Sequence, residues 1–61
     1  MLMNTIDWLT EKEAAEMLRI SLATLRRWRR RREGPPWFRI GRVPRYQRED
    51  VERFIEQQRQ S

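Results

Sequence analysis

Residues 10–36 read TEKEAAEMLRISLATLRRWRRRREGPP, and this stretch decides the fold. Its first part predicts a helix that begins at Glu11, because Thr10 and Glu13 have the spacing of a capping box. In that motif, each of the two side chains bonds the other residue's backbone N–H group. One face of the helix is small and apolar, so that a second helix can approach it closely; this face holds Ala14, Ala15 and Leu18.

A second helix is predicted after a short turn at residues 19–20. Ser21 suits its N-cap position, because a serine side chain can accept a hydrogen bond from an N–H group of the first turn. Apolar side chains follow at helical spacing: Leu22, Leu25 and Trp28. Gly34 suits the left-handed conformation that ends many helices, and the prolines at 35–36 cannot continue one. The second helix is therefore expected to end near residue 32 or 33.

The remaining residues predict a small hairpin and a third helix. Residues 37–40 alternate apolar and polar side chains, residues 41–42 form a turn, and residues 43–46 return as a second strand. Pro44 lacks the N–H group for a ladder hydrogen bond, so the return strand is expected at a sheet edge or with a bulge. The third helix is expected from Arg48, with two acids in its first turn, where the helix dipole favours negative charge. Its apolar face holds Val51, Phe54 and Ile55.

The chain is thus predicted to be a single domain over residues 1–61, mainly α with a small β-hairpin. Residues 57–61 are expected to be a polar end that frays. A domain of this size buries roughly 60% of the surface that its unfolded chain exposes, so its stability is expected to be marginal.

Positive charge is concentrated in the middle of the chain. The net charge is +5, but residues 19–48 hold eleven arginines against a single acid, Glu33. Thirteen of the fourteen basic residues are arginine, whose planar fork suits phosphate groups and guanine edges. A solvated charge run is the alternative, and the charge pattern by itself does not decide between the two.

Several protein classes are excluded by what the sequence lacks. There is no cysteine and no histidine, which excludes a disulfide framework and a Cys/His metal site. So short a chain builds too small a core for a sizeable catalytic cavity, and we expect no enzymatic activity, no metal and no cofactor. Residues 1–4 are too short for the apolar region of a signal peptide, and no apolar run reaches the roughly 18 residues of a membrane span. A cytoplasmic location is therefore expected.

The second predicted helix has an apolar face and a cationic face. On a wheel of about 100° per residue, Leu22, Trp28 and the stem of Arg32 fall within about 60° of Leu25 and are expected to face the core. Arg29 borders this stripe and is expected to lie along the protein or to pair with an acid. The opposite face is expected to enter the major groove of DNA, where arginine side chains can bond guanine O6 and N7. This face holds Ala23, Arg26, Arg27 and Arg30.

Four further residues are expected at DNA phosphates. Ser21 and Thr24 are capping residues first, but the N-terminus of a helix can also bond a phosphate. Arg31 flanks the cationic face, and Arg45 lies in the predicted hairpin. A basic amphipathic helix can also bind a membrane surface or a calmodulin-like partner. The apolar stripe is narrow, however, and the domain needs it to close its core, so no membrane association is expected.

Short motifs of the chain occur in the same order in one family of DNA-binding proteins. They are Leu9-Thr10 with Glu13-Ala14-Ala15, residues 21–28 (SLATLRRW), the diproline, Arg39-Ile40-Gly41-Arg42, and Arg48-Glu49-Asp50-Val51. Over Leu9 to Ile55, the chain resembles the small phage excisionases, which are recombination directionality factors with a MerR-like winged helix-turn-helix. The resemblance implies three helices plus a wing formed by the hairpin.

The resemblance also implies roles for individual residues. In the lambda-like excisionases, the arginines that match Arg27 and Arg30 enter the major groove, and the one that matches Arg42 reaches into the minor groove from the wing tip. Beside it, Gly41 would allow a close backbone approach. The position that matches Ala23 is acidic in that family and reads bases. Alanine can at most touch a thymine methyl group, so the recognised sequence is expected to differ.

A function follows from the resemblance as an expectation. Excisionases bind neighbouring repeats in double-stranded DNA cooperatively, bend the site and direct a tyrosine integrase toward excision. Duplex DNA, further copies of the chain and an integrase are therefore the expected partners. Transcription regulators of phages and plasmids share the fold, and this alternative stays open.

Overall fold

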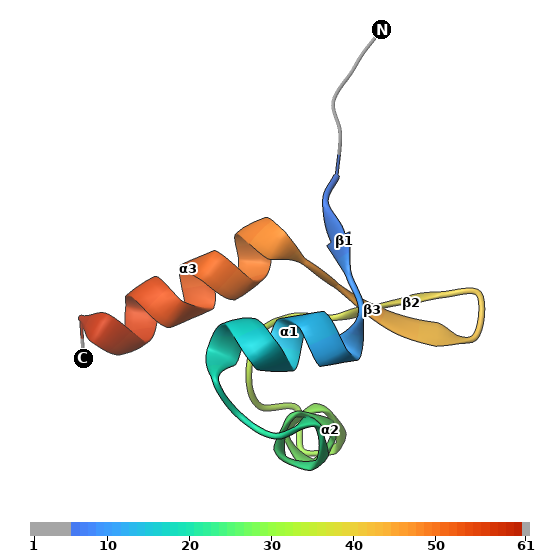
Figure 1. Cartoon of the computed structure of the whole chain (residues 1–61), viewed down its shortest axis with the longest axis horizontal. Coiled ribbons are helices and arrows are strands. Elements are labelled where there is room, and N and C mark those ends of the chain that lie inside the picture. Colours follow the sequence, from blue (N-terminus) through green and yellow to red (C-terminus); the bar gives the residue numbers. More distant parts are fainter. Residues whose placement is uncertain (1–5, 61) are drawn as a thin grey trace, which may run out of the picture.

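The computed structural model describes residues 6–60, which form three helices and a three-stranded antiparallel sheet (Figure 1). Along the chain the elements are β1 (Trp8–Leu9), α1 (Glu11–Leu18), α2 (Leu22–Arg30), β2 (Phe38–Ile40), β3 (Val43–Gln47) and α3 (Arg48–Arg59). This is the predicted winged helix-turn-helix, with β2, β3 and their turn as the wing. The expectations for residues 1–4 and for Ser61 lie outside the described residues. Within 6–60, no helix is both long and apolar enough to cross a membrane.

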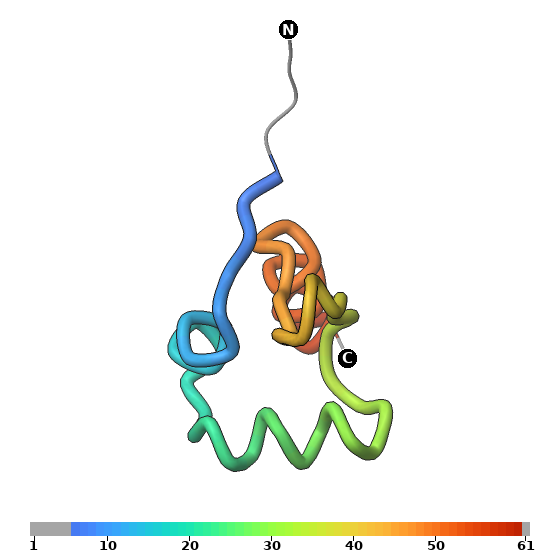
Figure 2. The backbone as a smooth tube through the Cα atoms, turned by 90° about the vertical axis from the view of Figure 1, so that its right-hand side faces the viewer, coloured from blue at the N-terminus to red at the C-terminus, as the bar shows by residue number. Residues whose placement is uncertain are grey.

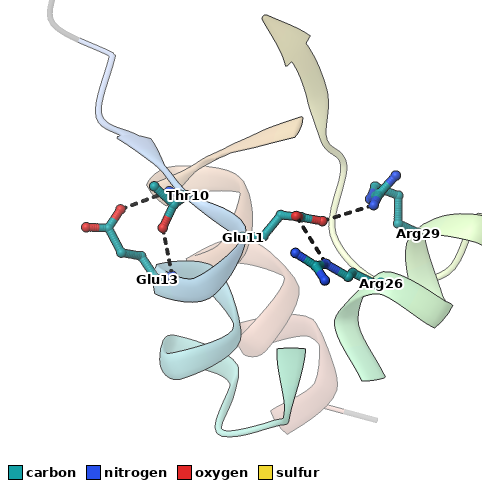
Figure 3. Close-up of polar contacts among 5 residues, drawn as sticks. All are labelled: Thr10, Glu11, Glu13, Arg26 and Arg29. Atoms are coloured by element: carbon teal, nitrogen blue, oxygen red, sulfur yellow. Dashed lines mark hydrogen bonds and ion pairs between the residues drawn. The ribbon is translucent and has the colours of Figure 1, made fainter. Parts of the chain in front are cut away.

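The first helix begins where the capping box predicts. Thr10 Oγ1 accepts a hydrogen bond from Glu13 N–H at 3.0 Å, and Glu13 Oε1 accepts one from Thr10 N–H at 2.8 Å (Figure 3). The predicted start at Glu11 is confirmed. After the helix, Arg19 adopts the left-handed conformation with a φ of 60°, and its N–H bonds back to carbonyls of the last turn. This local reversal leads the chain into α2 within two residues.

The second helix begins as predicted but ends earlier. Ser21 Oγ accepts a hydrogen bond from Thr24 N–H at 3.0 Å, as expected of an N-cap. The helix stops at Arg30 rather than near residue 32 or 33. The reason is that Arg32 adopts the left-handed conformation, with a φ of 59°, and turns the chain away from the helix axis. Arg32 is exposed, so the prediction that its stem faces the core is wrong.

Gly34 allows a close approach to Trp28. Its φ of 83° confirms the left-handed conformation that was predicted for it, but Gly34 lies beyond the residues that close the helix. A Cβ atom at this position would come within 2.7 Å of Trp28 Cε3. The ring of Trp28 in turn packs against Phe54 of α3, with 5.9 Å between the ring centroids. Glycine is thus needed here because the loop folds back against the indole.

The sheet contains a strand that was not predicted. Its order is β1-β3-β2, and β1 pairs only with Tyr46 and Gln47, whereas β2 pairs with residues 43–45 in continuous register. Pro44 lies opposite Arg39 of β2 and has no β1 residue on its other side. The expectation that the return strand lies at a sheet edge or carries a bulge is therefore wrong, because β3 is the central strand; Pro44 is tolerated there because β1 does not reach it. The unbroken register needs no bulge.

Most of the helices and strands contribute one or two residues to the core. The buried apolar residues of the core are Leu9, Ala14, Ala15, Leu25, Tyr46 and Val51. Partly buried apolar residues pack around them: Met17, Leu18, Ile20, Trp28, Trp37 and Ile55. The two alanines allow α1 to pack closely against its neighbours, as the sequence predicts. Leu25 is the buried residue of α2, which leaves the opposite side of that helix outside the core.

The start of α3 is hydrogen-bonded to Asp7, the residue that precedes β1. Arg48 Nε donates a hydrogen bond to Asp7 Oδ2 at 2.5 Å, and Arg48 N–H donates to the Asp7 carbonyl at 3.0 Å. The hydrogen bond and the charge of Asp7 raise the pKa of the Arg48 guanidinium. α3 then continues to Arg59, into the segment that was expected to fray.

Candidate nucleic-acid interface

The cationic face of α2 lies on the outside of the molecule. Figure 2 shows α2 running along one side of the fold, with the other elements on its inner side. The residues predicted for the major groove are all exposed: Ala23, Arg26, Arg27 and Arg30. The structure therefore brings the predicted reading residues together on one accessible helix face.

Glu11 pairs with two of the arginines of α2. Its carboxylate lies 3.0 Å from Arg29 Nη2 and 3.4 Å from Arg26 Nε (Figure 3). The Arg29 side chain is 19% exposed and the Arg26 side chain 49%. Arg29 is thus held along the protein and paired with an acid, as the wheel predicts. Arg26 is held more loosely, while the side chains of Arg27 and Arg30 make no ion pair with any residue in 6–60.

Trp37 connects α2 to the wing. The guanidinium carbons of Arg29 and Arg39 lie 5.2 and 5.3 Å from the centroid of its ring, within the range of cation–π attraction. Sequence reasoning did not assign Arg39 or Trp37 to this arrangement. Their only signal was an aromatic residue between arginines, because the contact with Arg29 depends on the folded chain.

The charges around Glu11 also affect a buried tyrosine. Burial raises the pKa of the Tyr46 phenol; the charge of Arg29 opposes this change and that of Glu11 adds to it. Because Tyr46 is 1% exposed, it belongs to the core rather than to a binding surface. The ion pair between Glu11 and Arg29 therefore belongs to the packing that holds α1, α2 and β3 together.

The N-terminus of α2 is organised by two hydroxyl groups. Ser21 Oγ accepts from Thr24 N–H and donates to Thr24 Oγ1 at 2.9 Å. Both predicted phosphate-binding residues are therefore engaged in capping. At such a helix end, the N–H groups of the first turn have no carbonyl partner within the helix and can bond an anion.

The wing projects away from the helices, as Figure 1 shows. At its tip, Gly41 has a φ of 65°, and a Cβ atom there would meet nothing within 4 Å. Arg42 is exposed beside it, and Arg45 is half-buried farther along β3. The predicted minor-groove residues thus lie at the end of a protruding hairpin, with open space beside Gly41.

A basic groove lies where the chain leaves α2 and enters the wing. It has a volume of about 460 Å³ and is lined by Arg29, Arg30, Arg32, Glu33, Gly34, Pro35, Pro36 and Trp37. Arg32, which was expected to face the core, therefore adds to the cationic surface. The neighbouring Arg31, a predicted phosphate ligand, is also exposed. In the described part of the chain, no group of acidic side chains could hold a metal ion.

The architecture agrees with a comparison with known protein families. Residues 8–59 match the model of the family described as helix-turn-helix domain, and this match includes every element from β1 to α3. No curated protein and no solved structure matches the chain significantly. The family match indicates DNA binding, and it agrees with an exposed cationic helix beside a protruding wing. The chain belongs to the helix-turn-helix domain family.

Proposed function

We propose that the protein is a sequence-specific architectural DNA-binding protein that acts as an excisionase. In this role it binds repeated sites cooperatively, bends duplex DNA and directs a tyrosine integrase toward excision. The observation that carries DNA recognition is the exposed position of Arg27 and Arg30 on α2, without an acidic partner among residues 6–60. The excisionase role rests on the resemblance over Leu9 to Ile55.

In the proposed complex, α2 enters the major groove. A helix about 10 Å wide fits this groove, which is roughly 12 Å wide, and its arginine forks can bond guanine edges. Arg27 and Arg30 would make the main base contacts, with Ala23 beside them. Arg26 would first have to loosen its 3.4 Å contact with Glu11, so its contribution is smaller.

The remaining predicted contacts surround that groove. Arg42 would enter the adjacent minor groove from the wing tip, where Gly41 allows a close approach. Arg31 and Arg45 would hold phosphates, together with the end of α2 at Ser21 and Thr24. Contacts in two grooves at once would favour curved DNA, at an elastic cost of about 1 to 6 kcal/mol that the protein contacts offset.

Cooperative binding follows from the small size of the domain. A single module of this kind buries roughly 600 to 1,000 Å² on DNA, which gives modest affinity and specificity. Several copies on neighbouring repeats would bind with higher affinity and specificity than a single copy.

The experiment that tests this function has two stages. Footprinting on the attachment region of the element that encodes the protein should show protection of several adjacent repeats. A reconstituted recombination reaction with the element's integrase should then show more excision when the protein is added. Repression of a promoter without any effect on recombination would instead identify a phage or plasmid transcription regulator. No protection of any duplex would contradict DNA recognition itself.

A further inference from the structure

The wing carries exposed apolar side chains on one face of the sheet. Phe38 and Ile40 alternate along β2, and Val43 lies directly opposite Ile40 across the turn. Their exposed fractions are 42% for Phe38, 46% for Ile40 and 43% for Val43. Residues opposite each other in an antiparallel pair share a face of the sheet, so the three side chains lie on the same side.

The root and the tip of this apolar face differ. At the root, the Phe38 ring packs edge-on against Trp8, with 5.5 Å between centroids and 78° between planes. At the tip, Ile40 and Val43 flank the two-residue turn Gly41-Arg42. Neither belongs to the core or to the partly buried residues packed against it. The tip thus presents a pair of aliphatic side chains whose Cβ atoms are expected to lie about 5 Å apart.

We infer that Ile40 and Val43 form an apolar wedge that inserts against a base step in the minor groove and kinks the DNA. This inference rests on the proposed DNA-binding function and assigns the bend to two residues. Minor-groove proteins commonly insert aliphatic side chains between base pairs, unstack them partly and kink the duplex by about 20 to 90°. The wedge would stand beside Arg42, whose charge holds the tip in the groove.

The charge around the tip favours a polyanion over a protein partner. Within the hairpin, residues 38–47, the chain contains Arg39, Arg42 and Arg45 and no acid. A strongly cationic hairpin with an apolar end suits a negatively charged groove that is floored by stacked bases.

The area of the tip leads to the same conclusion. A stable protein interface needs about 800 Å² from each partner, about a sixth of the 4767 Å² accessible surface of this molecule. Two half-exposed aliphatic side chains at the end of a narrow hairpin supply only a small part of that area. They match the size of a single base step better.

The test uses the full chain and a duplex that contains its footprinted site. The fluorescent base 2-aminopurine is placed in turn at each step beneath the wing, and bending is measured by energy transfer between the duplex ends. Wild-type protein should raise the fluorescence several-fold at one step, because unstacking relieves quenching there. The double variant Ile40→Ser, Val43→Ser should lose this rise and most of the bend while keeping the same footprint.

Two controls make the result specific. Ile6→Ser removes an apolar side chain of similar exposure, 49%, away from the wing tip, and should leave the rise and the bend unchanged. Circular dichroism checks that each variant folds, and the single variant Ile40→Ala serves if the double variant does not. Wild type should also bind a duplex with a mismatch at that step roughly tenfold more tightly, because part of the unstacking is already done, and the double variant should lose this preference.

The outcomes separate the wedge from the proposed function. If wild type binds and protects the site without a fluorescence rise at any step, or if the double variant bends DNA fully, the wedge is wrong and DNA recognition stands. The wedge is equally wrong if the double variant loses only self-association in solution, because the tip would then dock a second copy. If wild type binds no duplex at all, the proposed function fails first and the wedge with it.

Discussion

Replacement of Arg27 or Arg30 by alanine tests the reading face most directly. Both side chains are exposed on α2 and make no ion pair with residues 6–60, so the change removes neither a core contact nor an internal partner. Alanine is the best helix former, and a substitution at such a surface position changes stability by less than about 0.5 kcal/mol. Loss of one bidentate contact to guanine costs about 1 to 3 kcal/mol, equivalent to about a 5-fold to 150-fold rise in Kd.

The assay compares affinities for the footprinted site and for a scrambled duplex at one salt concentration. Each variant should lose affinity mainly for the specific site. Arg26→Ala should lose less, because its guanidinium is already shared with Glu11 at 3.4 Å. Arg59→Ala is the matched control: it removes the same charge from an arginine of α3 whose side chain is 74% exposed, and it should behave nearly as wild type. If Arg27→Ala and Arg30→Ala both bound the specific site as wild type does, the assignment of the reading face would be refuted.

Four further predictions concern salt, stability and pH. With roughly four phosphate contacts, the logarithm of the association constant should fall against the logarithm of salt concentration with a slope near −3.6, and a flat titration by anisotropy would contradict this. Glu11→Gln should lower the free energy of unfolding by about 1 to 3 kcal/mol in urea titrations, because Arg29 loses its charged partner; stability equal to wild type would show that the ion pair contributes nothing. Gly34→Ala should destabilise the fold more than Gly41→Ala in the same titrations: both strain a left-handed residue by about 1 to 2 kcal/mol, but only at Gly34 would the new Cβ meet another side chain. Burial raises the pKa of Tyr46, the chain's single tyrosine, so the unfolded chain releases this proton more readily and stability should fall as pH rises above about 10. Phenolate absorbance follows that ionisation directly, and a Tyr46→Phe variant should lack this part of the pH dependence.

Local signals in the sequence predicted correctly where the helices start and which face of α2 is exposed. The capping box at Thr10 and the N-cap at Ser21 depend on residues three positions apart, so the sequence alone contains them. The early end of α2 was missed, because it depends on a non-glycine residue, Arg32, in the left-handed conformation. β1 was missed because a two-residue strand exists only through its pairing with Tyr46 and Gln47, far along the chain.

The candidate interface shows the same difference between properties of one element, which the sequence predicts, and contacts that depend on packing, which it does not. Helical periodicity placed Arg27 and Arg30 on an exposed face, since that property depends on α2 alone. It could not find the partner of Arg26, because Glu11 lies 15 residues earlier and meets it only after α1 and α2 have packed. The exposed aliphatic pair at Ile40 and Val43 was also overlooked. Alternation alone does not tell which face of a short hairpin is covered.

The position of Trp37 between two guanidinium groups has a mechanical consequence. Arg29 extends from α2 and Arg39 from β2, and each contacts the same indole ring. These two contacts therefore connect the base of the hairpin to α2 in addition to the diproline loop. If α2 and the wing bind DNA together as proposed, they would hold a nearly constant spacing, so a duplex that bends easily to this spacing would bind more tightly than a stiff one.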